Sequence, residues 1–171
     1  PFFLALHLGV SGLLVLYAFF LKKQPLIGNL LVAGLCAASP GAVWWLVEEP
    51  LSGRDVLLFS GMRIWATVFL GFSFWVTLYR EMVKDMEDVE GDRLSACRTL
   101  PVLWGIDTSR KLAMLIGIFL WMGVSWSIAI SFIHLPAWIA LFGLLTVWLP
   151  IGASFPILYR AQSPQDFHRL S

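Results

Sequence analysis

The chain has 171 residues, of which 58% are hydrophobic, 15% aromatic and only 13% charged, and its mean hydropathy is +0.79. This composition excludes an ordinary soluble domain and indicates a polytopic helical membrane protein. The formal net charge is only +1, and we expect no nucleic-acid partner.

Five segments are long and apolar enough to cross a bilayer, which takes about 20 predominantly apolar residues. The alternating pattern of a membrane β-barrel is absent from the sequence, so each segment is expected to satisfy its backbone as a helix. We predict an all-α transmembrane helix bundle, a single domain over 1–171. Its spans are expected at about 2–21, 25–47, 56–79, 112–133 and 136–159.

The two ends of the chain suggest a longer bundle. The chain begins without Met inside an apolar segment. Near its other end, Ser163, Pro164 and Asp166 have the order of an N-cap and the first and third residues of a helix. We therefore expect five spans and the start of a sixth, from a protein whose N-terminal spans are missing here.

Lys and Arg collect at alternate ends of the predicted spans, as they do on the cytoplasmic side of membrane proteins. Applied to this chain, the rule places the loop between the third and fourth spans in the cytoplasm, with the protein in the inner (cytoplasmic) membrane. Ten of the twelve basic residues follow the rule: Lys22, Lys23, Arg80, Lys84, Arg93, Arg98, Arg110, Lys111, Arg160 and Arg169.

Six of the eleven acidic residues follow the third span, between Glu81 and Asp92. Nothing before Gly91 in this stretch breaks a helix, so we expect the third helix to extend past the membrane surface to about residue 91. Two of the acids, Glu87 and Glu90, point away from the rest and are interpreted as solvated charge. The other four share one face within an arc of about 60°: Glu81, Asp85, Asp88 and Asp92.

A face of four carboxylates repels itself, because like charges at i, i+4 destabilise a helix by a few tenths of a kcal/mol each. One interpretation is that the charges only solvate a cytoplasmic loop. The other follows from the DxxDxxxD spacing, because Mg²⁺ is usually held by one or two carboxylates together with waters and substrate phosphates. Neighbouring basic side chains suit an anionic ligand that is bound through such a metal.

The stretch REMVKDMEDVEGDR at 80–93, followed by TLPVLWG at 99–105, resembles the second aspartate-rich motif of the UbiA superfamily of intramembrane prenyltransferases. The sequence PLIGN at 25–29 agrees with it, and the resemblance covers essentially the whole chain. Members of this family are helix bundles around a central cavity that is open to lipid. The present chain would correspond to their later helices.

The resemblance implies Mg²⁺-dependent transfer of a prenyl group from an allylic prenyl diphosphate to a lipophilic acceptor, among membrane lipids. Carried over by position, Asp85, Asp88 and Asp92 would bind Mg²⁺, and Lys84 would contact the diphosphate. Glu81 would orient a ligand or act as a base toward the acceptor. Further diphosphate contacts are expected from Arg80, Arg93, Arg98 and Asn29. For Asn29 the alternative is a packing hydrogen bond.

Two features depart from the usual pattern of the family. The first aspartate-rich motif, NDxxDxxxD, is not in these 171 residues, so the chain supplies half of the expected active site. Arg80 stands where many members have a Tyr, which makes the motif closest to the geranylgeranyltransferases that act on geranylgeranylglyceryl phosphate. Their acceptor is a glycerol hydroxyl. The alternatives are an aromatic-acceptor enzyme of quinone, haem or chlorophyll biosynthesis, and a non-catalytic transporter or assembly subunit.

Overall fold

The computed structural model describes residues 2–21, 24–52, 56–161 and 163–170, with the backbone alone for 2–7, 18, 48–52 and 56–59. Throughout these ranges the regular elements are helical, which confirms the all-α prediction. They are α1 Phe2–Phe19, α2 Ile27–Ser52, α3 Val56–Glu87, α4 Val89–Leu94, α5 Leu100–Trp104, α6 Ile106–His134, α7 Ala137–Gly143, the π-helix η2 Leu144–Trp148, α8 Leu149–Arg160 and α9 Pro164–His168.

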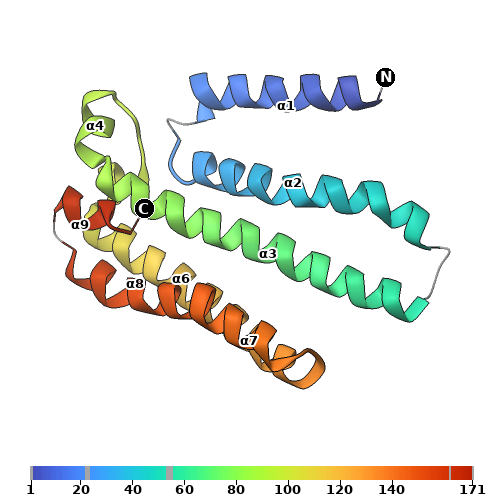
Figure 1. Cartoon of the computed structure of the whole chain (residues 1–171). Helices are drawn as coiled ribbons and strands as arrows, with labels where there is room; N and C mark the ends of the chain where they lie inside the picture. Colours follow the sequence, from blue (N-terminus) through green and yellow to red (C-terminus); the bar gives the residue numbers. More distant parts are fainter. Residues whose placement is uncertain (1, 22–23, 53–55, 162, 171) are drawn as a thin grey trace.

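The long helices lie side by side, with α2 against α3, α3 against α6, and α6 against the α7–α8 segment (Figure 1). Four segments are long and apolar enough to cross a membrane. They are Ile27–Val47, Ser60–Glu87, Ile106–His134 and Ala137–Arg160. The first predicted span, 2–21, corresponds to α1. The continuous part of α1 whose side chains are described, Leu8–Tyr17, is apolar but shorter than a membrane span. The chain is an integral membrane protein.

The helix that carries the acidic residues is longer than a bilayer requires. α3 has 32 residues, which correspond to about 48 Å against a hydrocarbon core of about 30 Å. The chain bends at Asp88 and continues as α4. Hydrogen bonds from Asp88 N to Lys84 O and from Asp92 N to Asp88 O, both 2.9 Å, carry the helical ladder through the bend. Asp92 is therefore helical, one residue beyond the predicted limit.

Pro150 explains why the last predicted span is not a uniform α-helix. Proline has no N–H and cannot donate to the carbonyl four residues earlier. The turns immediately before it, Leu144–Trp148, widen into the π-helix η2, and α8 continues from Leu149 to Arg160. The segment 137–160 thus spans the bundle as α7, η2 and α8 together.

The most deeply buried side chains lie near the end of α3 that carries the charges. Met82 and Met86 of α3 pack in one cluster with Leu158 of α8 and Phe167 of α9. The short helix α9 begins with the predicted cap, because the Ser163 hydroxyl accepts from Asp166 N at 3.3 Å while the Asp166 carboxylate accepts from Ser163 N at 3.1 Å. This cap directs α9 back onto α3 (Figure 1).

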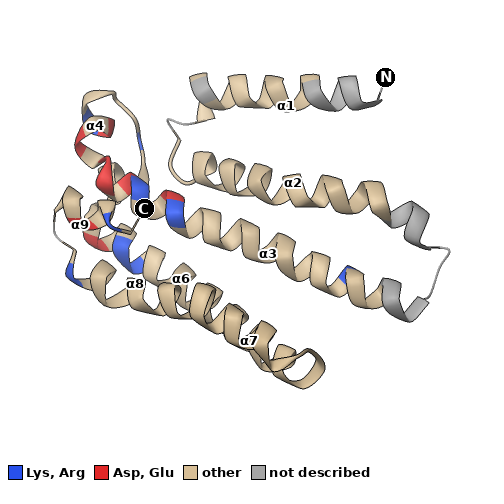
Figure 2. Ribbon diagram, viewed as in Figure 1, with Lys and Arg blue, Asp and Glu red and all other residues tan. Residues whose placement is uncertain are grey.

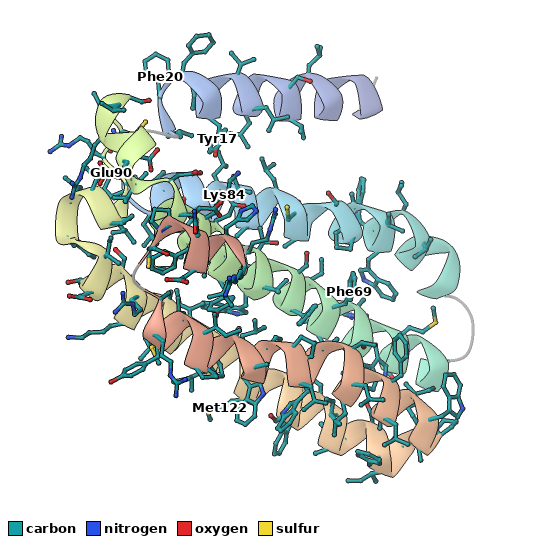
Figure 3. All side chains as sticks on the ribbon, turned by 60° about the vertical axis from the view of Figure 1, so that its left-hand side comes forward. Tyr17, Phe20, Phe69, Lys84, Glu90 and Met122 are labelled. Atoms are coloured by element: carbon teal, nitrogen blue, oxygen red, sulfur yellow. The ribbon has the colours of Figure 1, made fainter. Side chains whose placement is uncertain are left out.

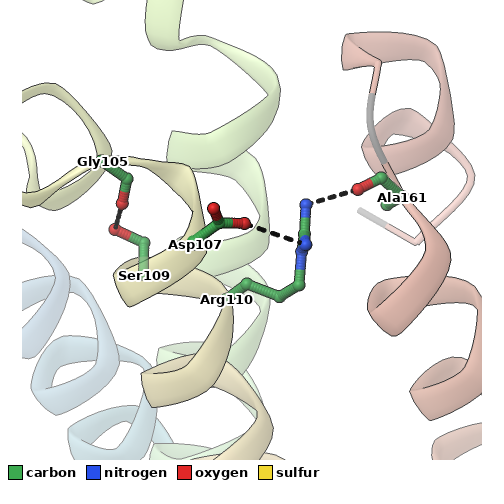
Figure 4. Close-up of polar contacts among 5 residues, drawn as sticks. All are labelled: Gly105, Asp107, Ser109, Arg110 and Ala161. Carbon is green, nitrogen blue, oxygen red and sulfur yellow. Dashed lines mark hydrogen bonds and ion pairs between the residues drawn. The ribbon is translucent and has the colours of Figure 1, made fainter.

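A second tie at this end joins α6 to the end of α8 (Figure 4). The Arg110 guanidinium donates to the Ala161 carbonyl and pairs with Asp107 at 3.1 Å. The Ser109 hydroxyl donates to the Gly105 carbonyl at 3.0 Å, in the first turn of the same helix. Arg110 is thus occupied in holding two helices together.

Candidate active site

Charged side chains gather at one end of the bundle, where α4 and α9 meet the ends of α3 and α6 (Figure 2). Among the side chains that the structure describes on the long helices, Arg63 is the charged residue toward the opposite end. The candidate site is therefore confined to one end of a largely apolar bundle.

The four predicted carboxylates do lie near one another on the last turns of α3 and on α4. Those of Glu81, Asp88 and Asp92 are close enough to Asp85 to act on its charge. Asp88 is exposed, whereas Asp85 and Asp92 are half-buried and the Glu81 side chain is only 17% exposed. The result is a concentrated negative face with both buried and accessible oxygens, which we call the acidic face.

Two neutral side chains from other segments hold the ends of the acidic face. The Asn29 amide of α2 donates to Asp85 Oδ2 at 2.7 Å. The Thr99 hydroxyl, in the loop before α5, donates to Asp92 Oδ2 at 2.9 Å. Asn29, for which a diphosphate contact or a packing hydrogen bond was expected, thus contacts a carboxylate of the acidic face. Thr99 is the first residue of the TLPVLWG stretch, but it was not among the predicted site residues.

The predicted basic residues differ in how they relate to the acidic face. Arg80 Nη1 lies 3.8 Å from Glu81 Oε1, so it borders the face. Arg93 Nη1 lies 3.6 Å from Glu90 Oε1, the acid predicted to point away from the face. The other two are exposed: Lys84, labelled in Figure 3, and Arg98.

Glu87 was interpreted as solvated charge, and this was wrong. Its side chain is only 21% exposed, and its Oε1 lies 2.7 Å from Nδ1 of His168. His168 belongs to α9 and is 81 residues away in sequence. Glu87 therefore helps to hold α9 against the end of α3.

Tyr17 is a site residue that the sequence did not reveal. Figure 3 shows it on the side of α1 that faces α2 and α3. Its hydroxyl lies close enough to Glu81 and Asp85 for both carboxylates to act on it. Its position at the charged end of an apolar helix was the one available signal, and many interfacial Tyr residues share that position.

The donor set can be tested against Mg²⁺. Within the described residues, no three His, Cys, Asp or Glu side chains converge closely enough to hold a metal ion by themselves. A closed protein cage is not what Mg²⁺ requires, since it is usually bound by one or two carboxylates and keeps waters and substrate phosphates. Asp85 and Asp92 each retain an Oδ1 outside these two hydrogen bonds, so the acidic face fits Mg²⁺ that is shared with a diphosphate.

An apolar cavity of about 780 Å³ lies elsewhere, between α3, α6 and the α7–η2 segment. Its wall on α3 runs from Trp65 to Trp75, which ends ten residues, or about 15 Å, before Asp85. Val68, Phe72 and Trp75 in that wall are turned by about 80–140° from Asp85 around the helix axis. The cavity therefore opens on another face of α3 from the carboxylates.

Comparison with known proteins supports the resemblance. The model of the UbiA prenyltransferase family matches residues 1–171. The digeranylgeranylglyceryl phosphate synthase of Thermococcus kodakarensis is 34% identical over 156 residues, which are 88% of this chain and 42% of that protein. The protein of the same name from Methanosarcina mazei is 34% identical over 139 residues, 81% of this chain and 41% of the relative. The protein of the same name from Thermococcus sibiricus is 35% identical over 111 residues, which are 65% of this chain and 35% of that protein.

The chain spans between 35% and 42% of the length of these three curated relatives. No solved structure shows significant similarity to it. Because the family model covers all of its residues, the chain belongs to the UbiA prenyltransferase family.

Proposed function

We propose that the protein transfers a prenyl group from an allylic prenyl diphosphate to a glycerol hydroxyl of a phosphorylated ether-lipid precursor. The observation that carries this proposal is the acidic face at one end of apolar, membrane-spanning helices. A lipid diphosphate has the same division, with an anionic head and an apolar tail. The family model and the names of the curated relatives support the choice of donor and acceptor.

In this proposal Asp85, Asp88 and Asp92 hold Mg²⁺, with Lys84, Arg80 and Arg98 close to the diphosphate. Bound Mg²⁺ would neutralise the negative charge that develops on the departing diphosphate. The basic side chains add positive charge at the same place. The anionic carboxylates serve the diphosphate only through the metal, because without it they would repel that group.

The transfer breaks one C–O bond and forms another. The bond between the allylic carbon and the diphosphate breaks, and its electron pair leaves with the diphosphate. The acceptor hydroxyl oxygen then bonds to that carbon, and the hydroxyl proton passes to a base. Glu81 is suited to that role because its carboxylate lies on the acidic face and is largely screened from solvent.

We place this chemistry on the cytoplasmic side of the membrane. All described Lys and Arg side chains apart from Arg63 lie at the end that carries the acidic face, as the positive-inside rule predicts for a cytoplasmic end. A donor with an anionic head would then be taken from the cytoplasmic leaflet.

The test is a transfer assay with the full-length protein in detergent, geranylgeranyl diphosphate as donor, and Mg²⁺ or EDTA. Offering geranylgeranylglyceryl phosphate beside an aromatic acceptor separates the two acceptor classes. Asp85→Asn and Asp88→Asn should each lower the rate by about 100- to 1,000-fold, as expected when charge stabilisation at the reacting centre is lost. Glu90→Gln is the matched control, because Glu90 is 74% exposed and pairs with Arg93.

Full activity in both Asp variants would overturn the assignment of the acidic face. Transfer to the aromatic acceptor alone would support prenyl transfer but would overturn the proposed glycerol acceptor. Transfer that is equally fast in EDTA would remove the metal from the proposal.

A further inference from the structure

The second half of the acidic face is held by an unusual loop. After α4 the Cys97 N–H donates to the Asp92 carbonyl at 2.9 Å and the Ala96 N–H donates to the Arg93 carbonyl at 3.2 Å. This is the bond pattern of a Schellman helix end, with Ala96 in the left-handed region at φ +53°. The chain therefore reverses immediately after α4 and brings Thr99 back beside Asp92.

Thr99 occupies a capping position without acting as a cap. It is the N-cap residue of α5, where a Thr oxygen ordinarily accepts from the N–H of the second or third helical residue. Here the side chain makes no such bond, and the second helical residue is Pro101, which has no N–H. The hydroxyl instead donates to Asp92 Oδ2, and Thr99 is only 7% exposed.

Asn29 makes the corresponding contact at the other end of the face. It lies in the first turn of α2, is 9% exposed, and donates from Nδ2 to Asp85 Oδ2. Asp85 and Asp92 are separated by two helical turns. The donor to Asp85 precedes α3 in the sequence, whereas the donor to Asp92 follows α4. Each carboxylate is thus fixed through one oxygen by a buried neutral donor.

The neutrality of the donors matters for what the carboxylates can bind. A Lys or Arg partner would cancel the negative charge, whereas an amide or a hydroxyl restricts rotation and leaves the charge in place. Carboxylates that ligate metals are commonly hydrogen-bonded in this way, and loss of such a partner costs about 10- to 100-fold in metal affinity. We infer that Thr99 and Asn29 are positioning residues that orient Asp92 and Asp85 so that each presents Oδ1 to a metal ion shared with the diphosphate.

This inference rests on the proposed function for the identity of the ligand, so its test measures metal binding separately from transfer. Mn²⁺ can replace Mg²⁺ as a probe. We would measure free Mn²⁺ by electron paramagnetic resonance while titrating the full-length protein with inorganic diphosphate present. Thr99→Val removes the hydroxyl at nearly constant volume, and Thr99→Ser restores it.

We expect Thr99→Val to weaken Mn²⁺ binding by about 10- to 100-fold, and Thr99→Ser to remain within about threefold of the wild type. In the transfer assay the Val variant should need more Mg²⁺ for its half-maximal rate, while its rate at saturating Mg²⁺ stays close to that of the wild type. Asn29→Leu should show the same shift through Asp85. Thermal unfolding in detergent is recorded for every variant.

Three results would overturn the inference. The first is Mn²⁺ binding by Thr99→Val equal to that of the wild type. The second is a lower unfolding temperature with unchanged metal dependence, which would make Thr99 structural only. The third is the absence of Mn²⁺ binding in the wild type. If Mn²⁺ binding depends on the Thr99 hydroxyl but the wild type transfers no prenyl group, the inference stands and the proposed function fails.

Discussion

The apolar body of the bundle and its charged end use polar side chains in different ways. In the apolar body, hydroxyls mostly donate to the carbonyl four residues earlier in their own helix, as Ser127 does to Gly123 and Thr146 to Phe142. At the charged end, polar side chains reach across to other segments, as Asn29 does to Asp85. Hydroxyl groups in the body are thus mostly satisfied within their own helix, whereas polar side chains at the charged end fix the positions of particular carboxylates.

This difference indicates where each half obtains its stability. The body depends on close apolar packing, which tolerates little change in volume. The charged end depends on contacts between separate segments: Thr99 with Asp92, His168 with Glu87, and Phe167 with α3. Variants directed at one half should therefore leave the other largely unchanged.

The largest effect is expected from Phe167→Ala. Phe167 is 1% exposed in the cluster that joins α9 to α3 and α8, and truncating a buried Phe costs about 3–5 kcal/mol. Hydrogen exchange followed by mass spectrometry should rise over residues 79–94 and stay unchanged over 118–130. Gln165→Ala, on the exposed side of α9, is the control. A uniform rise along the chain would contradict the division into two halves.

A smaller effect, on the packing of α6 against α3 and α8, is expected from Gly117→Ala. A Cβ there would lie 2.7 Å from Phe155 Cε1 and 2.9 Å from Tyr79 Cε2, so the ring packing must shift. Overpacking of this kind costs about 1–3 kcal/mol of unfolding free energy, measurable by thermal unfolding in detergent. Gly123→Ala is the matched control, because nothing lies within 4 Å of its added Cβ. Equal destabilisation by both would argue against close packing at Gly117.

The smallest effect should be a gain in stability from Ala96→Gly. An L-residue in the left-handed region costs roughly 1–2 kcal/mol, which the Gly variant would avoid. Gly also raises the conformational entropy of the unfolded chain, which lowers stability by about 0.4–1 kcal/mol. We expect a net gain of about 0.5–1 kcal/mol in thermal unfolding. The neighbouring Ser95→Gly, at φ −87°, should be destabilising instead. Destabilisation by both substitutions would show that Ala96 is not strained.

Features that depend on local geometry could be predicted from the sequence. The acidic face follows from helical spacing, since Asp85, Asp88 and Asp92 are neighbours along one helix and its continuation. The α9 cap follows from Ser163 and Asp166, because a capping box involves residues three apart.

The ties between distant segments could not be predicted in this way. Asn29 and Asp85 are 56 residues apart, and their contact depends on how α2 packs against α3. The loop that returns Thr99 to Asp92 turns at Ala96, which has a left-handed backbone conformation. A Gly at this position would have indicated such a turn, whereas an Ala does not. Glu87 and His168 are likewise 81 residues apart, and their contact depends on α9 packing back against α3.

The central claim is that the acidic face binds a prenyl diphosphate through a divalent metal. The most direct measurement is the binding of a non-reactive thiolo analogue of geranylgeranyl diphosphate to the full-length protein, by equilibrium dialysis in Mg²⁺ and in EDTA. We predict binding that requires Mg²⁺ and that Asp85→Asn weakens by at least about 10-fold. Equal affinity in EDTA, or in the Asp85→Asn variant, would contradict the claim.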